Sequence, residues 1–303
     1  MCKLFAITGK TNKDTARRLL FSVNSMYAKT QKHGFGFVAM APDGYAYGRY
    51  KDPENYVGFD VKNIPAFLRA DGFEEGTLPE TSNLLIAHGR TSTNAISPAN
   101  VHPFRKDNLF LAHNGMVGWL GKKADEPASS AGCDSEQLLN WLVAGGTWEE
   151  ASTVWGGWGA VMLADVATQQ MCIAVHSTRL HCAKRAYGKG WVFATDDDDL
   201  VWICRQSGVK LATRPIKIPT HLVYTGPDGR IEADREWDGF DSRNTNAMFQ
   251  HTGHGGYEVT IYKHGKKWKA RESSFQNQEN NGIPEYRPQP FSGQPNGFMG
   301  TEM

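Results

Sequence analysis

A cysteine stands at position 2, directly before a short apolar run, residues 3–8 (KLFAIT), which ends at Gly9. An apolar run of this length bounded by glycine predicts a buried strand. Strands hold side chains more rigidly than loops do, so a reactive group on Cys2 would be positioned with precision. The fold must therefore accommodate an interior strand at the very start of the chain, with Cys2 at its head.

Cys2 becomes a nucleophile of a special kind if Met1 is removed. It then carries a thiol, with a reference pKa of about 8.5, and a free α-amino group, with one of about 7.7–8.0, so the amine can act as base for the thiol near neutral pH. Nucleophile and base then share one residue, and no partner histidine is required. The alternative is an incidental cysteine, and the residues downstream decide between the two.

A helix and a hairpin are predicted next. Residues 13–30, which Thr11 or Asn12 can cap, carry apolar side chains on one helical face: Ala16, Leu19, Leu20, Val23 and Tyr27. Residues 33–50 consist of two β-rich runs around a Pro-Asp-Gly turn, which predicts a β-hairpin. Gly36 in the first run permits close backbone approach, either to a neighbouring strand or to a ligand.

Two further apolar strands each end in a polar cluster. Leu84–Ala87 is followed by His88-Gly89-Arg90, and Leu109–Ala112 is followed by His113-Asn114-Gly115. Polar groups at the ends of two buried strands point into a common pocket or out to solvent. The planar guanidinium of Arg90 is suited to binding a carboxylate.

The pair Asn114-Gly115 has two interpretations. The side-chain amide of Asn114 and the unobstructed backbone N–H of Gly115 are the donors that an oxyanion hole needs. Asn-Gly is also the strongest short-range signal for a hairpin turn, so the residues alone leave a turn open.

Asp134 likewise has two interpretations. A helix is predicted from Ala131 to about Val143, and Asp134 with Gln137 matches a capping box, which makes Asp134 its N-cap. The same carboxylate could receive the ammonium group of a substrate. One carboxylate has enough lone pairs for both roles.

The chain is rich in β-structure from residue 155 onward. Strand pairs are predicted over 155–177 and from His221 to about Trp237, with several more strands over 180–205. Four consecutive acids, Asp196–Asp199, do not alternate as a chelating loop would, and no glycine or downstream glutamate completes one. An exposed acidic turn is therefore predicted there in place of a metal site.

Composition excludes several classes of function. Lys and Arg total 33 against 32 Asp and Glu, which leaves no net field to attract nucleic acid or an anionic membrane. The five cysteines show no CxxC pair, so neither a disulfide framework nor a zinc site is expected, and no cofactor is indicated. Without a signal peptide or an apolar run long enough to span a bilayer, we expect a cytoplasmic protein.

The composition shifts at about residue 239. We predict one domain over residues 1–238 and a polar tail rich in Asn, Gln, Gly and Pro over 239–303. Residues 257–270 predict a hairpin within this tail, and 274–298 should be disordered. Residues 51–83 are interpreted as a long surface excursion.

Several of these residues form a recognisable pattern. In chain order they are Cys2, His88-Gly89-Arg90, His102-Pro103-Phe104, His113-Asn114-Gly115, Asp134-Ser135-Glu136, a glycine-rich strand pair at 156–165, and Val192-Phe193-Ala194-Thr195. The pattern resembles the class II glutamine amidotransferases, whose glutaminase domain belongs to the N-terminal-nucleophile (Ntn) hydrolases. The resemblance covers about residues 2–235. It implies an α+β fold, a four-layer αββα sandwich of two antiparallel sheets between helix layers.

The resemblance also implies catalytic roles. Cys2 looks like the nucleophile that attacks the side-chain amide of L-glutamine and forms a thioester. Asn114 and Gly115 look like the oxyanion hole. The products are glutamate and ammonia, and no metal or other cofactor takes part.

Substrate-binding roles follow in the same way. By the resemblance, Arg90 would hold the α-carboxylate of glutamine and Asp134 its α-ammonium group. His88 and Thr91, beside Arg90, are also counted as substrate-binding residues. These roles favour the functional interpretations of Asn114-Gly115 and Asp134 over the turn and the N-cap.

The chain departs from the family in three places. Many members have glycine after the cysteine, where this chain has Lys3, and an arginine is common where His176 stands. Members usually carry a synthase domain, but only the polar tail 239–303 follows here, which is too short and polar to be such an enzyme. We therefore expect the ammonia to pass to a separate synthase subunit or to be released.

Two other functions compete with a glutaminase. One is a hydrolase with an N-terminal cysteine that acts on another amide and has no synthase partner. Arg90 and Asp134 discriminate between these, because an amide lacking either charged end would leave a buried ion unpaired. The other is a binding module that kept the fold and lost catalysis, which the joint presence of Cys2, Asn114, Gly115 and Arg90 disfavours.

Overall fold

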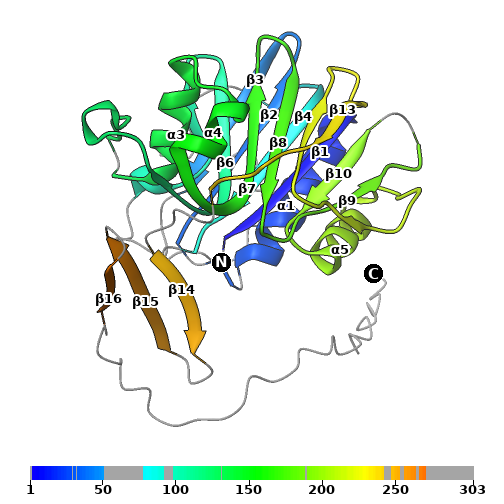
Figure 1. Cartoon of the computed structure of the whole chain (residues 1–303). Coiled ribbons are helices and arrows are strands. Elements are labelled where there is room, and N and C mark those ends of the chain that lie inside the picture. The colour runs from blue at the N-terminus through cyan, green and yellow to red at the C-terminus, as the bar shows by residue number, and fades with distance from the viewer. Residues whose placement is uncertain are drawn as a thin grey trace, which may run out of the picture. The chain divides into compact units, whose positions relative to one another are not determined.

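A computed structural model describes the chain in ten segments: residues 2–28, 30–31, 33–50, 78–91, 98–130, 132–187, 190–241, 247–252, 256–263 and 266–270 (Figure 1). It divides into two compact units, Met1–Thr245 and Asn246–Met303. The predictions for 274–298 and for most of 51–83 lie outside the described residues.

The first unit is built on two antiparallel sheets. One has seven strands in the order β11-β9-β10-β1-β4-β2-β3, namely β1 (Lys3–Asn12), β2 (Phe35–Ala41), β3 (Gly44–Tyr50), β4 (Thr81–Gly89), β9 (His181–Lys184), β10 (Trp191–Ala194) and β11 (Ile216–Lys217). The other has six strands in the order β13-β12-β8-β7-β6-β5, namely β5 (Phe104–Lys106), β6 (Leu109–Trp119), β7 (Trp155–Asp165), β8 (Gln170–His176), β12 (His221–Thr225) and β13 (Ile231–Glu236).

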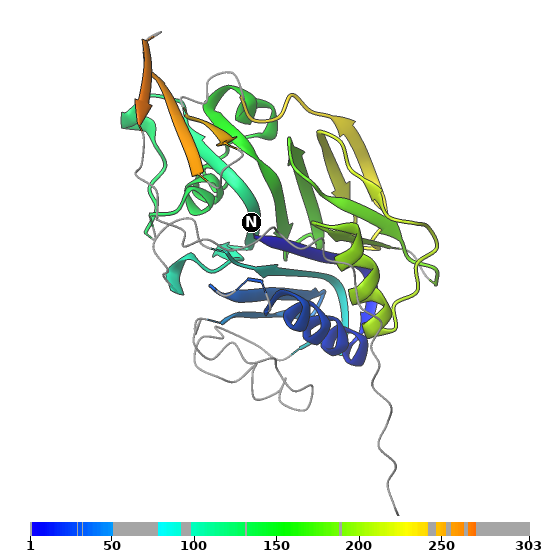
Figure 2. The same cartoon turned by 90° about the horizontal axis from the view of Figure 1, so that it is seen from below.

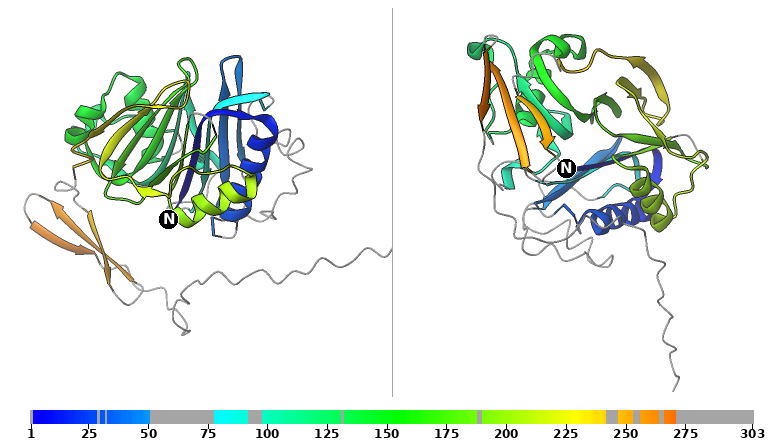
Figure 3. Two further views of the ribbon diagram at one scale, coloured as in Figure 1. Left: turned by 90° about the vertical axis from the view of Figure 1, so that its right-hand side faces the viewer. Right: turned by 60° about the horizontal axis from the view of Figure 1, so that its bottom comes forward.

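Helices cover the outer face of each sheet. Helices α1 (Lys13–Ala28) and α5 (Asp197–Ser207) pack on the seven-stranded sheet, and α3 (Asp134–Val143) and α4 (Trp148–Val154) pack on the six-stranded sheet (Figures 2 and 3). Short 3₁₀ turns occupy η2 (Pro98–Asn100) and η3 (Lys123–Asp125). Three apolar clusters separate the four layers, one between the sheets and one under each pair of helices. The predicted αββα sandwich is confirmed.

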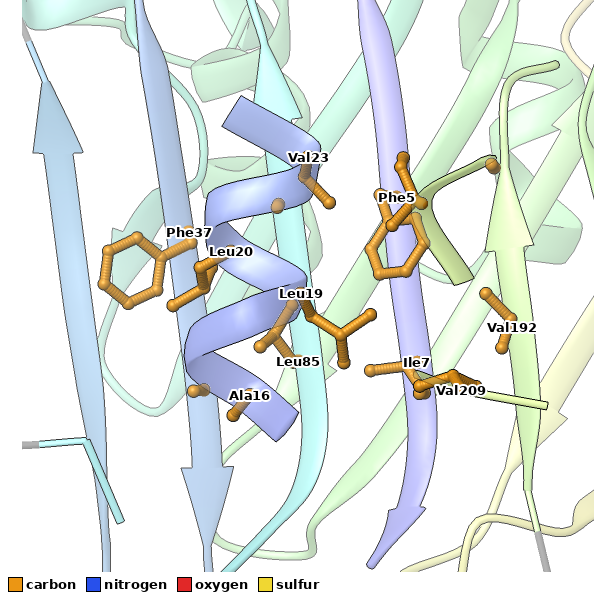
Figure 4. Close-up of a cluster of buried hydrophobic side chains, with 14 of the residues drawn as sticks. Phe5, Ile7, Ala16, Leu19, Leu20, Val23, Phe37, Leu85, Val192 and Val209 are labelled. Carbon is orange, nitrogen blue, oxygen red and sulfur yellow. The ribbon is translucent and has the colours of Figure 1, made fainter. Parts of the chain in front are cut away.

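Strand β1 lies inside the seven-stranded sheet and is buried on both faces. Phe5 and Ile7 pack beneath α1, whereas Leu4 and Ala6 pack between the two sheets (Figure 4). Side chains of a strand alternate between its two faces. When both faces pack against apolar layers, the sequence of the strand is therefore a continuous apolar run. The predicted strand after Cys2 is confirmed.

The local patterns that predicted α1 and the first hairpin are also confirmed. The side-chain oxygen of Asn12 accepts a hydrogen bond from the Thr15 N–H at 2.8 Å and caps the helix. The five predicted core residues of α1 are buried: Ala16, Leu19, Leu20, Val23 and Tyr27. Strands β2 and β3 pair from Phe35–Tyr50 to Ala41–Gly44, as the hairpin requires.

One element differs in kind from the prediction. Residues 200–205, part of the range where strands were expected, belong to helix α5, and of the four acids expected in an exposed turn Asp196 is its N-cap and the other three form its first turn. Acidic side chains are favourable in the first helical turn because the helix dipole is positive there. Asp196 and Asp199 also form ion pairs with Lys3, the latter at 2.9 Å, so this acidic cluster ties α5 to the head of β1.

The second unit contains a three-stranded antiparallel sheet. Its strands are β14 (Ala247–Thr252), β15 (Gly256–Lys263) and β16 (Lys266–Ala270), with β15 in the centre. The pair β15–β16 falls in the range where a hairpin was predicted. The division into two compact units does not show what either unit does. The assignment of residues 1–238 as a glutaminase domain and 239–303 as a tail therefore stays a prediction.

No helix in the described segments combines the length and the apolar character needed to cross a bilayer.

Gly36 tests how closely strand β2 approaches the backbone at His102. A Cβ on Gly36 would lie 2.1 Å from the carbonyl oxygen of His102, whereas one on Gly118 would meet no described atom within 4 Å. We expect Gly36→Ala to lower the free energy of unfolding by about 1–3 kcal/mol, as overpacking does. Gly118→Ala, the control, should change it by less than about 0.5 kcal/mol. Urea unfolding measures both, and equal midpoints would contradict the close approach.

Candidate active site

Cys2 lies directly before β1 and beside the segment that follows β4. Lys3, the first residue of β1, is paired with Gly89, the last residue of β4. The Cys2 thiol donates a hydrogen bond to the carbonyl oxygen of Thr91, at 3.3 Å. The structure therefore brings Cys2, which is half-buried as a residue, together with the predicted residues Arg90 and Thr91.

Strand alternation directs two of the predicted residues, His88 and Asn114, to the layer between the sheets. Leu4 of β1 and Ile86 of β4 face the layer between the sheets. His88 of β4 shares this face with Ile86, because side chains two apart along a strand share a face, whereas Cys2 and Arg90 lie one residue beyond the ends of β1 and β4. On β6 of the opposite sheet, Phe110 and Ala112 face the same layer, so the side chain of Asn114 does so too.

Arg90 is held by its backbone and buried. Its N–H donates to the Gly34 carbonyl at 2.8 Å, and its own carbonyl accepts from the His33 N–H at 3.0 Å. Burial lowers the pKa of Arg90, and the Cys2 and Cys133 sulfurs act in the opposite direction. The guanidinium thus lies within electrostatic range of both sulfurs.

Burial also governs the Cys2 thiol. It raises the pKa of Cys2, and the negative charge of Asp134 raises it further, whereas the positive charge of Arg90 lowers it. Burial is the largest of these effects, so the thiol is protonated at neutral pH and needs a base to become a nucleophile. The same interactions place Asp134 within electrostatic range of Cys2.

Asn114 and Gly115 lie in the middle of β6, so the alternative of a hairpin turn is wrong. They pair with Ala160 and Gly159 of β7, and β6 runs on to Trp119. A Cβ on Gly115 would lie 2.2 Å from the carbonyl oxygen of Trp158, so only glycine permits this approach of the two strands. The side-chain nitrogen of Asn114 donates a long hydrogen bond, 3.4 Å, to the Thr195 hydroxyl oxygen.

Asp134 is the first residue of α3 and not its N-cap. The N-cap position is held by Cys133, which makes no side-chain capping bond to a described residue, so the predicted capping box is wrong. One carboxylate oxygen of Asp134 accepts from the Val117 N–H of β6 at 2.9 Å, and the other accepts from the Ser135 N–H at 2.8 Å. Asp134 therefore joins the start of α3 to the strand that carries Asn114.

Three buried histidines lie near these residues. Nε2 of His88 and Nδ1 of His102 are 3.1 Å apart and form a hydrogen bond, and Nδ1 of His113 bonds the Ser135 hydroxyl at 2.9 Å. Burial lowers the pKa of His88 to about 3, and it also lowers the pKa values of His102 and His113. The three rings are therefore neutral at pH 7.

The predicted residues His88 and Thr91 make their observed contacts with protein groups. The His88 ring bonds His102, and the Thr91 hydroxyl bonds the side chain of Gln31. The Thr91 carbonyl, in contrast, touches Cys2. Within the described segments, no three His, Cys, Asp or Glu side chains gather as a metal ion would require.

Sequence reasoning assigned no role to Thr195 or Cys133, which the structure adds to this region. Thr195 is the last residue of the quoted Val192–Thr195, and Cys133 stands directly before the quoted Asp134. Both residues could be located from the sequence. Their roles could not, because Thr195, for example, contacts Leu4 and Asn114, which are distant from it in sequence.

Comparison with known proteins gives a likeness in fold. No family model and no curated protein sequence matches the chain. The glutamine phosphoribosylpyrophosphate (PRPP) amidotransferase from B. subtilis, complexed with ADP and GMP, matches over 81% of this chain and 50% of its own, with a TM-score of 0.52 and 19% sequence identity. A structure described as the allosteric regulatory enzyme of purine biosynthesis matches over the same shares, with a TM-score of 0.54 and 18% identity.

The chain thus spans about half the length of these two proteins. At such low identity the likeness establishes the α+β sandwich that they share with this chain. It also agrees with the fold that the sequence pattern predicted.

The buried histidines predict how stability depends on pH. Unfolded histidine has a pKa of about 6.5, and the folded values for His88, His102 and His113 are lower, so below pH 6.5 the unfolded state binds more protons. The free energy of unfolding should therefore fall as the pH drops from about 7.5 to 5. Each histidine contributes a slope of up to about 1.4 kcal/mol per pH unit.

Urea unfolding across this range measures the slope. His88→Gln should flatten it by up to about 1.4 kcal/mol per pH unit, because one of the titrating groups is removed. Stability that stays constant between pH 7.5 and 5 would show that these histidines bind protons equally in the folded and unfolded states, which would contradict the lowered pKa values.

Proposed function

We propose that this protein hydrolyses the side-chain amide of glutamine to glutamate and ammonia, through a thioester at Cys2. The observation that carries the proposal is the position of Cys2, directly before an interior strand, with its thiol bonded to the Thr91 carbonyl oxygen next to Arg90. The fold is shared with a protein named as a glutamine PRPP amidotransferase, which supports the same class of reaction.

The proposed reaction uses groups of this chain alone. Once Met1 is removed, the α-amine of Cys2 takes the thiol proton, and the thiolate attacks the amide carbon of the substrate. The α-ammonium group of Cys2 gives this proton to the amide nitrogen as the C–N bond breaks, so that ammonia leaves, and water then hydrolyses the thioester to glutamate and the free Cys2 thiol. The Asn114 amide and the Gly115 N–H would stabilise the negative oxygen formed in each step.

Substrate binding is assigned to two charged residues. The Arg90 guanidinium would bind the α-carboxylate, since its planar fork matches two carboxylate oxygens. Asp134 would bind the α-ammonium group. The oxygen of Asp134 that accepts from Val117 has a second lone pair, which leaves capacity for this contact. His88 and Thr91 remain predicted substrate-binding residues, although their observed side-chain contacts are with His102 and Gln31.

The ammonia is proposed to pass to a separate acceptor enzyme. An amidotransferase, as the B. subtilis protein is named, delivers nitrogen to an acceptor. All five cysteines are free thiols, which favours the reducing cytoplasm as the compartment in which both proteins meet.

One observation favours the second candidate, hydrolysis of a different amide. Asp134 already accepts hydrogen bonds from Val117 and Ser135, which would give it a purely structural role. A substrate without an α-ammonium group would then suffice, and the Cys2 chemistry would be unchanged.

Processing and activity can be tested on the same sample. We expect the intact mass of the purified protein to lack Met1, and glutamate release from glutamine to depend on Cys2, because the free amine and the thiol are both required. Cys2→Ala should abolish turnover, and Cys172→Ala, a buried cysteine outside the site, should retain it. A processed protein that leaves glutamine intact would refute the proposal. A protein that keeps Met1 should be inactive until the amine is freed.

Arg90 distinguishes the two candidate substrates. Arg90→Lys keeps the positive charge and loses the planar fork, so kcat/KM for glutamine should fall by about 10–100-fold, mainly through KM. An amide analogue of glutamine without the α-carboxylate should be turned over poorly by the wild type, and Arg90→Lys should change that rate little. Equal losses on both substrates would mean that Arg90 binds no carboxylate.

A further inference from the structure

We propose that Thr195 is a positioning residue that fixes the head of β1 and the Asn114 side chain relative to one another. Thr195 follows the last residue of β10 and is 5% exposed. It belongs to neither the nucleophile nor the substrate-binding set. The kinetic part of the inference rests on the proposed glutaminase activity.

Thr195 holds β1 two residues after Cys2. Its N–H donates to the Leu4 carbonyl at 3.1 Å, and the Leu4 N–H donates to the Thr195 hydroxyl oxygen at 2.8 Å. If β10 continued through Thr195, a backbone carbonyl would accept the hydrogen bond from the Leu4 N–H. Here the Thr195 hydroxyl oxygen accepts it instead. A residue without this hydroxyl leaves the buried Leu4 N–H without that acceptor.

The same hydroxyl oxygen reaches across to the opposite sheet. It accepts a hydrogen bond from the side-chain nitrogen of Asn114 at 3.4 Å. That nitrogen carries two hydrogens, so one can be directed to Thr195 while the other remains for a substrate oxygen. A hydroxyl oxygen has two lone pairs, and here Leu4 and Asn114 engage both. One atom therefore links the strand of the proposed nucleophile to the proposed oxyanion donor.

Thr195 is itself held in place. Nδ1 of His181 bonds the Thr195 carbonyl oxygen at 3.2 Å, and the next residue, Asp196, is ion-paired with Lys3. The hydroxyl of Thr195 is therefore fixed by hydrogen bonds of the Thr195 backbone and side chain and by the ion pair of Asp196. Catalytic geometry depends on such supporting contacts, because small displacements of a donor from the developing charge reduce the rate strongly.

Thr8 provides a matched control on the same strand. Its hydroxyl is also buried, accepts from the Trp191 N–H at 2.9 Å and donates to the Gly229 carbonyl at 2.8 Å. Thr8 lies toward the other end of β1, away from Cys2. Thr8→Val and Thr195→Val therefore both remove a buried hydroxyl that accepts from a backbone N–H, and only the second touches the site.

The experiment compares wild type, Thr195→Val, Thr195→Ser and Thr8→Val. Urea unfolding should show a similar loss of stability in the two valine variants. Under conditions where all are folded, Thr195→Val should lower kcat for glutamine by about 10–100-fold with KM within about 3-fold, because the loss lies in the transition state. Thr195→Ser should return kcat to within about 3-fold of wild type, and Thr8→Val should leave it unchanged. A kcat for Thr195→Val equal to that of Thr8→Val would overturn the inference.

A second readout does not require glutamine turnover. The rate at which iodoacetamide alkylates Cys2, followed by peptide mass spectrometry, reports how tightly the head of β1 is held. Thr195→Val should raise this rate at least about 3-fold, and Thr8→Val should leave it at the wild-type value. If the wild type turns over no glutamine, the proposed function fails, and this rate alone decides the role of Thr195. Equal alkylation rates in both valine variants would then refute it.

Discussion

Burial of β1 on both faces is the constraint on which the site depends. Leu4 and Ala6 enter the layer between the sheets, and Phe5 and Ile7 pack beneath α1. Removing a large apolar side chain from water contributes about 1.5–3 kcal/mol, so this strand is anchored strongly in one register. A slip by one residue would exchange its faces and turn Cys2 away from the interior. The packing that folds the chain therefore also aims the thiol.

Polar contacts then hold the first residues of β1 in detail. The Tyr27 hydroxyl of α1 donates to the Leu4 carbonyl at 2.9 Å, and Lys3 is ion-paired with the first turn of α5. Thr195 binds Leu4 from the neighbouring strand. Two helices, α1 and α5, and the residue after β10 therefore all contact Lys3 or Leu4, and Cys2 directly precedes these two residues in the chain. Lys3 has a structural role here, because the start of α5 provides its acidic partners, Asp196 and Asp199.

Features that depend on residues close together in the sequence could be predicted, whereas features that depend on distant partners could not. Helix α1 and the hairpin β2–β3 were found because their apolar periods and turn residues are local. Helix α5 was missed because its four opening acids resemble a turn, although Leu200 and Ile203 fall on a helical face. The Asn114-Gly115 turn and the Asp134 cap were wrong because their partners, Gly159 and Val117, come from pairing and packing that local propensity does not encode.

The surroundings of Cys2 bear on which group can act as its base. Burial dominates the pKa of the thiol, so Arg90 alone does not produce a thiolate at neutral pH. The buried histidines are poor candidates. The pKa of His88 is lowered to about 3, far from the neutral value a base needs, and its Nε2 is engaged by His102. His113 is directed to Ser135 on the α3 side of β6. Under the proposed function, the base is the α-amine that Cys2 would acquire on removal of Met1, so that processing of the chain would be linked to its chemistry.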